Sequence, residues 1–421
     1  MSSPANASTL ATPLPSAAAK QEGQTAFKII GGLSFAHFLN DMMQSLILAI
    51  YPIIKGQFSL SFAQIGMITL MYQLSASLLQ PLVGTFTDKR PQPYSLPVAM
   101  AFSFCGLLTL AFSTTYGGVI GAAMLMGIGS AIFHPEASRV ARLAAGGRHG
   151  LSQSLFQVGG NTGSAVGPLL AAIIILPYGR PNAAWFCLGA LTAMVVLVVI
   201  SNWYRRERLR GTQARKARAG GVQLSRKQVI GAIAVLLLLI FSKYFYLAGF
   251  QSYFTFYLIE RFGLSVQAAQ VHLFIFLFAS AAGTVLGGPI GDRIGRRRVI
   301  WGSILGVAPF ALILPHVGLE ATTVLSFLIA FVLSSAFSAI LVYAQELVPG
   351  RVGMISGLFF GFAFGMGGIG AATLGRTADA YGIITVYNIC AYLPLLGLFA
   401  WFLPEMRSVG EKPAQPQAAK A

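Results

Sequence analysis

The sequence predicts an all-α membrane protein whose twelve transmembrane helices form two six-helix bundles. Of the 421 residues, 55% are hydrophobic and only 10% are charged, with a mean hydropathy of +0.70. This is more apolar surface than one soluble core can bury. The chain also runs from Arg90 to Glu136, and from Glu320 to Glu346, without a formal charge. Because a helical span needs only ~20 apolar residues, such stretches can cross a membrane, and a soluble globular protein is excluded.

Apolar runs, read against the glycines, prolines and charges between them, divide the chain into twelve predicted spans. In the first half these are residues 29–54, 62–86, 95–113, 117–137, 151–176 and 182–203. In the second half they are residues 228–258, 268–290, 299–317, 321–347, 352–375 and 381–403. We therefore expect an N-terminal six-helix bundle over 29–203 and a C-terminal six-helix bundle over 228–403.

Basic residues set the predicted orientation. The net charge is +17, and 24 of the 29 basic residues fall in loops and tails on one side of the predicted spans. The positive-inside rule places that side, with both termini, in the cytoplasm. We expect residues 1–28 to be a disordered tail, 204–227 a basic linker and 404–421 a second tail. Orientation thus explains the basic excess, and no nucleic-acid partner is needed.

The two halves repeat each other. A shift of 204 residues aligns Gly84 and Asp88 with Gly288 and Asp292, and a shift of 203 aligns residues 148–167 with residues 351–370 at five positions. Duplication is the economical explanation. Two halves of the same orientation can rock about a central cavity, which favours alternating-access transport over a channel or a membrane-embedded enzyme.

Each aligned glycine and aspartate lies in the turn after the second helix of its half, ahead of basic residues. Glycine permits close approach of helices, and aspartate can cap a helix N-terminus or pair with an arginine. The pattern resembles the loop signature of the major facilitator superfamily, Gly-x-x-x-Asp-Arg-x-Gly-Arg-Arg. The second copy is nearly complete, and the first lacks the final basic pair. The resemblance implies a gating role for Gly84, Asp88, Gly288, Asp292 and Arg293.

Small residues line one face of the fifth predicted span. Gly159, Gly163 and Gly167 fall at helical spacing. They are similar to the antiporter motif of drug-efflux members of the superfamily, and close helix packing alone is an equal alternative. Those members carry a buried arginine in the fourth span, where this chain has Ala123. A proton relay based on that arginine is therefore absent.

Ionisable groups inside the predicted spans mark the candidate site, because each costs at least ~3 kcal/mol at the bilayer centre. The first span carries a polar stripe of His37, Asn40, Asp41 and Gln44. Lys243 lies in the middle of the seventh span, in the region that the repeat makes equivalent to that of Asp41. We expect Asp41 and Lys243 to face each other across the cavity and to bind proton and substrate. The alternative is a buried ion pair that only fixes packing.

Further polar residues lie in the fifth and seventh spans. We predict that Gln157, Asn161, Tyr246 and Gln251 bind substrate together with His37, Asn40, Gln44 and Lys243. Hydrogen bonds between helices are an equal alternative for Gln157 and Asn161. An aromatic belt at the membrane interface is the alternative for part of the seventh span.

Two more acids lie near the predicted cytoplasmic ends of helices. Glu136 precedes Arg139 by about one turn, and Glu346 precedes Arg351. Both glutamates are candidates for proton coupling beside Asp41. Pairing with arginines when a cytoplasmic gate closes, with Arg139 as part of that gate, is the favoured alternative.

Five segments carry a closer resemblance, to the fosmidomycin-resistance family of bacterial inner-membrane efflux pumps. They are residues 37–52 (HFLNDMMQSLILAIYP), 133–142 (FHPEASRVAR), 147–161 (GRHGLSQSLFQVGGN), 241–246 (FSKYFY) and 344–351 (AQELVPGR). The likeness extends over essentially the whole chain outside the tails. It implies export of fosmidomycin, a small phosphonate with a hydroxamate end, driven by inward proton flow. An anionic phosphonate is a fitting charge partner for Lys243.

The predicted function is therefore proton-coupled efflux, a drug/proton antiport of small amphiphilic or anionic antibiotics. The expected partners are the small-molecule substrate, protons and the lipid bilayer, and we expect a monomer. No cofactor or metal site is predicted, because Cys105, Cys187 and Cys390 lie in apolar runs without ligand spacing. A proton symporter importing a small organic anion is the alternative transporter. A membrane enzyme is a second alternative, but the sequence contains no motif of a nucleophile and a base. A sensor that binds a ligand without transporting it is a third alternative.

Overall fold

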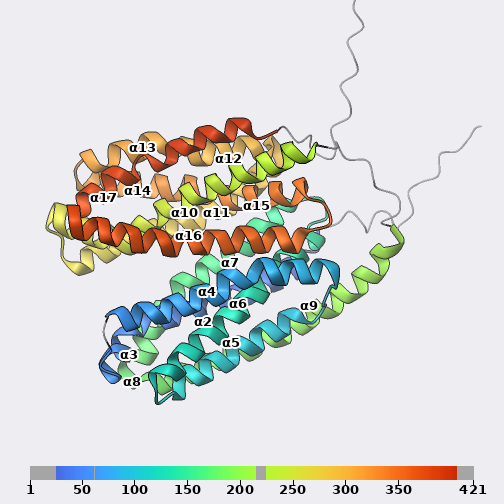
Figure 1. The fold of residues 1–421 in the computed structure, drawn as a ribbon, viewed down its shortest axis with the longest axis horizontal. Coiled ribbons are helices and arrows are strands. Elements are labelled where there is room, and N and C mark those ends of the chain that lie inside the picture. The colour runs from blue at the N-terminus through green and yellow to red at the C-terminus, as the bar shows by residue number, and fades with distance from the viewer. Residues whose placement is uncertain (1–24, 61, 215–223, 405–421) are drawn as a thin grey trace, which may run out of the picture.

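The computed structural model describes residues 25–60, 62–214 and 224–404. Within these ranges the regular secondary structure is helical, and no strand occurs. The helices form two bundles that lie side by side, with the N-terminal helices below and the C-terminal helices above in Figure 1. The all-α architecture predicted from the sequence is confirmed.

The N-terminal half begins with α2 and ends with α9. Its helices are α2 (Phe27–Ala49), α3 (Tyr51–Gln57), α4 (Phe62–Lys89), α5 (Ser95–Phe112), α6 (Tyr116–Ala144), α7 (His149–Leu170), α8 (Leu176–Tyr178) and α9 (Cys187–Ala214). A π-helical segment (Ala171–Ile175) follows α7, and a 3-10 segment (Arg180–Phe186) precedes α9. Thr115 begins α6 as an N-cap, because its hydroxyl accepts a hydrogen bond from the backbone N–H of Gly118 at 3.1 Å.

The C-terminal half begins with α10. Its helices are α10 (Arg226–Phe262), α11 (Val266–Ile294), α12 (Arg296–Ile304), α13 (Ala308–Ile313), α14 (Leu319–Ser334), α15 (Ala336–Leu347), α16 (Val352–Tyr381) and α17 (Ile383–Cys390), and the 3-10 segment Leu393–Phe402 follows them. Ser225 and Gln228 form a capping box at the start of α10. Gly263 ends that helix in the left-handed conformation that glycine adopts without strain, at φ 66°.

The helices coincide with the twelve predicted spans, and some spans are built from two shorter elements. In the described part of the chain, nine helical stretches are long and apolar enough to cross a membrane. α9 extends to Ala214 and α10 begins at Arg226, so helices enter the predicted linker 204–227 from both sides. Residues 1–24, 215–223 and 405–421, which belong to the predicted tails and linker, lie outside the described residues. The predicted domain boundaries stay predictions.

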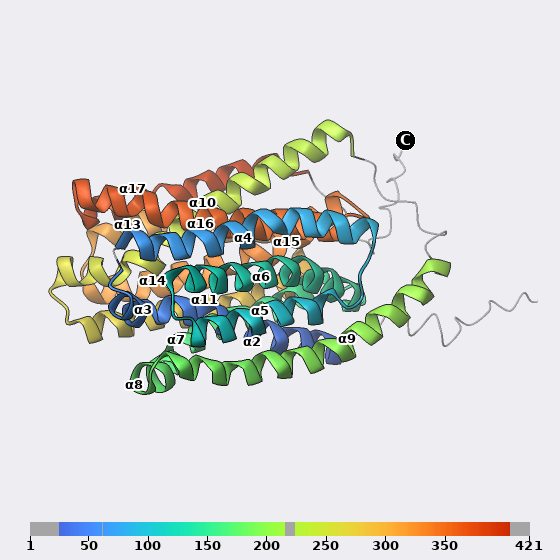
Figure 2. The same ribbon diagram turned by 60° about the horizontal axis from the view of Figure 1, so that its bottom comes forward.

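The two halves meet along two pairs of helices. α4 of the first half lies beside α16 of the second, and α7 lies beside α11. Figure 2 shows α4 and α16 running alongside each other over most of their length. We call the end of the molecule that carries Asp88 and Asp292 the motif end; it is at the right of Figure 1. These two helix pairs position the site described below.

Glycines bring α7 close to α2 within the N-terminal half. A Cβ added at Gly159 or Gly163 would collide with the backbone carbonyl oxygen of Ser34 or Phe38, respectively. A Cβ at Gly167 would collide with the hydroxyl of Ser45. The small-residue face predicted in the fifth span is thus a packing surface, because only glycine permits this approach.

Candidate functional site

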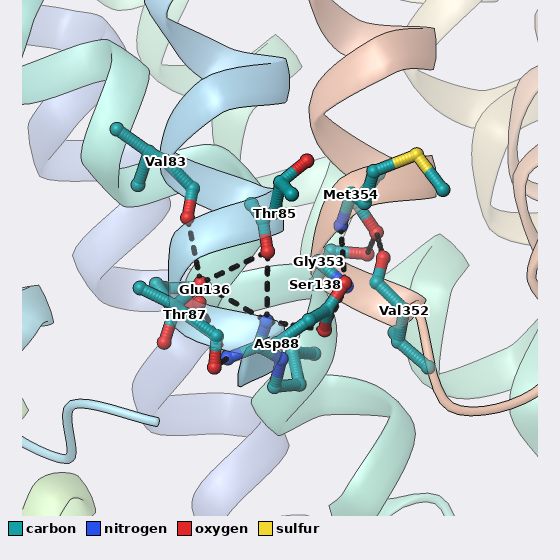
Figure 3. Close-up of polar contacts among 12 residues, drawn as sticks. Val83, Thr85, Thr87, Asp88, Glu136, Ser138, Val352, Gly353 and Met354 are labelled. Carbon is teal, nitrogen blue, oxygen red and sulfur yellow. Dashed lines mark hydrogen bonds and ion pairs between the residues drawn. The ribbon is translucent and has the colours of Figure 1, made fainter. Parts of the chain in front are cut away.

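Asp88, near the end of α4, caps the N-terminus of α16 in the opposite half. Figure 3 shows its carboxylate pointing at the first turn of α16. The backbone N–H groups of Gly353 and Met354 donate to its two oxygens at 3.0 and 2.8 Å. A Cβ on Gly84 would collide with the backbone carbonyl oxygen of Gly353, so glycine is required for the two helices to meet. A carboxylate in this place satisfies free N–H groups and interacts favourably with the helix dipole.

Asp292, near the end of α11, makes the equivalent contact with α7. Its Oδ1 and Oδ2 accept hydrogen bonds from the backbone N–H groups of Gly150 and Leu151, each at 2.9 Å. A Cβ on Gly288 would collide with the backbone carbonyl oxygen of Gly150. The residues paired by the sequence repeat therefore occupy equivalent contacts, and each aspartate reaches the opposite half. Together they close the motif end.

Arginines tie the acids of the motif end to these aspartates. Arg139 pairs with Asp88 at 2.5 Å and with Glu136 at 2.8 Å, and Glu136 is buried beside it. In the other half, Arg296 pairs with Asp292 at 3.2 Å and with Glu346 at 3.0 Å. The structure thus places both glutamates in ion pairs at the motif end, and Glu346 pairs with Arg296 instead of Arg351, the arginine that follows it in the sequence.

Other predicted gate residues differ in their exposure and contacts. Arg293 is exposed at the end of α11. A buried polar network crosses the halves nearby: Gln345 of α15 donates to Ser138 of α6 at 3.0 Å and to Ser356 at 2.9 Å. Arg142 of α6 donates to the side-chain oxygen of Gln345 at 3.1 Å. This network adds to the closure made by the two capping aspartates.

A second buried cluster lies on α2 and α6, and we call His37, Asp41 and His134 the triad. His37 Nε2 lies 3.2 Å from Asp41 Oδ2, and His134 Nε2 lies 3.6 Å from Asp41 Oδ1. The histidine side chains are 2% and 1% exposed, and that of Asp41 is 16% exposed. Two imidazoles and a carboxylate in this arrangement can hold a proton or a divalent metal ion.

Sequence reasoning did not include His134 among the site residues. His37 and Asp41 are four residues apart and share a helical face, so their contact follows from helix geometry alone. His134 reaches Asp41 from another helix, and only the packing of α6 against α2 brings them together. In the sequence, the feature that could have marked His134 is its place before Pro135 within an apolar span.

Gly160 of α7 has no side chain, and side chains of the triad occupy the space beside it. A Cβ at this position would collide with His37 Nε2 and would lie 2.7 Å from Asp41 Oδ2. We expect Gly160→Ala to lower the free energy of unfolding by about 1–3 kcal/mol and to displace His37 from Asp41, because the site is overpacked. Thermal unfolding of the purified protein checks this. Gly31→Ala, where a Cβ meets no atom within 4 Å, is the matched control. Equal stability of the two variants would contradict the packing argument.

Lys243 of α10 is a buried cation held by aromatic rings. Its side chain is 4% exposed, and its Nζ lies 5.6 Å from the ring centroids of both Tyr244 and Phe337. Within residues 25–60, 62–214 and 224–404, no carboxylate lies at ion-pairing distance from this Nζ. In this structure Asp41 pairs with the two histidines and not with Lys243, its expected partner.

Aromatic rings connect Lys243 to the triad. Phe337, which contacts Lys243, stacks edge-on against Phe360 with ring centroids 5.1 Å apart. Phe360 of α16 in turn lies 5.1 Å from the ring of His134. The triad of the N-terminal half and Lys243 of the C-terminal half therefore contact the same row of rings. This row lies at the interface between the halves.

Four of the other predicted binding residues lie near the triad or the interface. Asn40 donates to Asp41 Oδ1 at 2.9 Å, and Gln44 accepts from the Tyr72 hydroxyl at 2.5 Å. Gln157 is buried, and its Oε1 has no hydrogen-bond partner among the residues that the structure describes. Asn161 donates to the hydroxyl of Thr284 in α11 at 3.1 Å, so this amide crosses between the halves.

The two remaining predicted binding residues lie apart from this group. The ring of Tyr246 is buried within the C-terminal half, with its centroid 5.3 Å from that of Phe250. Gln251 is exposed on α10.

Comparison with known proteins identifies relatives over nearly the whole length of the chain. The sequence model of the Major Facilitator Superfamily matches residues 33–274 and 236–421. The chain is 62% identical over 391 residues to the Fosmidomycin resistance protein of Escherichia coli (strain K12), covering 93% of this chain and 96% of that protein. It is 42% identical over 404 residues to the Uncharacterized MFS-type transporter YfnC of Bacillus subtilis (strain 168), covering 96% and 99%.

Solved structures of low sequence identity share the fold. The E. coli fucose:proton symporter FucP superposes with a TM-score of 0.69 at 15% identity, over 91% of this chain and 100% of that one. The human organic anion transporter MFSD10 gives a TM-score of 0.69 at 15% identity, over 90% and 100%. The arrangement of two bundles is therefore common to these transporters and this chain.

Proposed function

We propose that this chain, which belongs to the major facilitator superfamily and is a multi-pass membrane transporter, exports small anionic phosphonates such as fosmidomycin in exchange for protons. It acts in the bacterial inner membrane as a monomer, with the motif end and both termini facing the cytoplasm. The basic residues concentrated on that side support this orientation.

The buried amine of Lys243 carries the proposal for the substrate. Burial of a cation without a counter-ion is costly, and an anion that enters the same space relieves that cost. A phosphonate supplies both the charge and several acceptor oxygens. The relative at 62% identity is named for resistance to fosmidomycin, which supports a substrate of this class.

We assign proton binding in the exchange to Asp41 and its partners His37 and His134. Of the three acids predicted to couple protons, Glu136 and Glu346 are ion-paired to Arg139 and Arg296 at the motif end. We therefore assign these two glutamates to closure of the gate. Asp41 lies between α2 and α6, and its carboxylate oxygens are 3.2 and 3.6 Å from the Nε2 atoms of His37 and His134.

Alternating access follows from the contacts between the halves. With the caps of Asp88 and Asp292 in place, the motif end is closed. Separation of α4 from α16 and of α7 from α11 opens the same site to the cytoplasm, and drug enters from there. A bistable interface of this kind converts local binding into a movement of the two halves.

Transport in inside-out vesicles tests the proposed function. We expect a proton gradient that is acidic inside the vesicles, whose lumen corresponds to the periplasmic side, to drive accumulation of fosmidomycin in the lumen as protons leave. A proton uncoupler is expected to abolish this accumulation. Accumulation that an uncoupler leaves unchanged would exclude proton coupling. Movement of drug in the same direction as protons, instead of the opposite direction, would favour a proton symporter for organic anions.

A further inference from the structure

The hydrogen bonds of the triad fix which ring nitrogen of each histidine is available. His37 Nδ1 lies 2.8 Å from the backbone carbonyl oxygen of Phe156, and His134 Nδ1 lies 2.9 Å from that of Ser130. A carbonyl oxygen only accepts hydrogen bonds, so each Nδ1 carries the proton and donates it. In the neutral form of each ring, the lone pair is therefore on Nε2.

Both Nε2 atoms point at the carboxylate of Asp41. They are buried, and neither has a hydrogen-bond donor or acceptor of proper geometry among the described residues. With both rings neutral, two lone pairs would face carboxylate oxygens that are also acceptors. One added proton on either Nε2 turns its contact with Asp41 into a charge-assisted hydrogen bond. The triad is thus arranged to hold one proton, with Asp41 as the counter-ion.

No other charged group faces the triad from the helices packed around it in the described part of the chain. The charges that act on Asp41 are those of His37 and His134. From α7 the triad is faced by a backbone carbonyl and by Gly160, and from α16 by the rings of Phe360 and Phe364. Among the described residues, the charged groups of this cluster are therefore the three side chains of the triad themselves.

Lys243 and the triad lie at the two ends of one row of rings, formed by Phe337 and Phe360. We infer that the exchanged proton and the hydroxamate end of the drug compete for the Nε2 atoms of His37 and His134. This inference rests on the proposed function. With the phosphonate at Lys243, the hydroxamate O–H donates a hydrogen bond to a neutral Nε2, and a protonated Nε2 cannot accept it. The displaced proton leaves to water, and no bond within the drug is broken.

A matched pair of ligands tests the competition. One is fosmidomycin, and the other is its analogue with N–CH3 in place of N–OH, which has no donor at this position. We expect purified protein at about pH 8 to prefer the hydroxamate about tenfold, the value of one net hydrogen bond. At about pH 5 the higher proton concentration is expected to reduce the preference, because a protonated Nε2 cannot accept the hydrogen bond. Calorimetry at both pH values measures it.

Substitution of the histidines locates the effect. His37→Gln and His134→Gln are expected to remove the preference at about pH 8 while the N–CH3 analogue keeps its affinity, because glutamine places an N–H donor near the former Nε2. His272→Gln is the control, since His272 bonds to Thr323 at 2.8 Å and lies outside the triad. It is expected to behave as the unmodified protein.

Three results would overturn the inference and leave the proposed function standing. They are equal affinity for both ligands at about pH 8, a preference that survives both histidine substitutions, and zinc that copurifies with the protein and is lost in His134→Gln. The last would assign the triad to a metal ion. Failure of both ligands to bind the unmodified protein would instead refute the proposed function.

Discussion

Replacement of Lys243 by methionine is expected to weaken binding of fosmidomycin about 100-fold. A charge-assisted interaction at a buried site is worth about 2–4 kcal/mol, which corresponds to a factor of this size. Methionine keeps an unbranched side chain against the rings of Tyr244 and Phe337 but removes the charge. Because Lys243 has no carboxylate at ion-pairing distance in the described structure, its removal leaves no buried acid unpaired, and the protein is expected to stay folded.

Calorimetry with two ligands separates the role of the charge from that of packing. The Lys243→Met variant is expected to lose affinity for the phosphonate and to keep its affinity for an uncharged diester of the same compound. Lys227→Met, on the same helix but exposed, is the matched control and is expected to bind both ligands normally. Equal losses for the charged and the uncharged ligand in Lys243→Met would contradict charge pairing.

The second large effect is expected at the motif end. Asp88→Asn combined with Asp292→Asn removes two carboxylates that each accept two backbone N–H groups from the opposite half. Hydrogen bonds to a charged group contribute about 1.5–3 kcal/mol each, and asparagine restores only part of them. We expect the closed arrangement to lose about 2–4 kcal/mol, so that the open one is populated far more.

Accessibility of a buried reporter measures this opening. With the three native cysteines replaced, Ser138→Cys places a thiol at the polar network between the halves, where the native side chain is 1% exposed or less. Its reaction with a charged maleimide is expected to be much faster in the double variant. Asp379→Asn, an exposed acid near the other end of α16, serves as the control. Unchanged labelling in the double variant would show that the caps do not hold the halves together.

The sequence predicted those features that depend on local pattern or on the repeat. Helical spans follow from hydropathy, because an apolar run of sufficient length has few alternatives to a membrane helix. Asp88 and Asp292 were predicted in equivalent roles because glycine and aspartate recur at the same place in both halves. Their contacts across the interface confirm the equivalence of these positions.

The sequence alone did not predict which residues of different helices contact each other. The rotation of α6 against α2 brings His134 to Asp41, and nothing in the spacing along either helix specifies that rotation. The repeat made the regions around Asp41 and Lys243 equivalent, but equivalent positions do not have to touch. Gln251 is exposed on α10, and its predicted role in binding stays a prediction.

We propose that drug and proton exclude each other from one site between the two halves. Proton release on addition of fosmidomycin to purified protein, in weak buffer with a pH indicator, tests it most directly. Our account predicts that protons appear in solution as drug binds, and that the release saturates together with binding followed by calorimetry. Drug that binds with normal affinity while no proton is released, or while protons are taken up, would contradict the account.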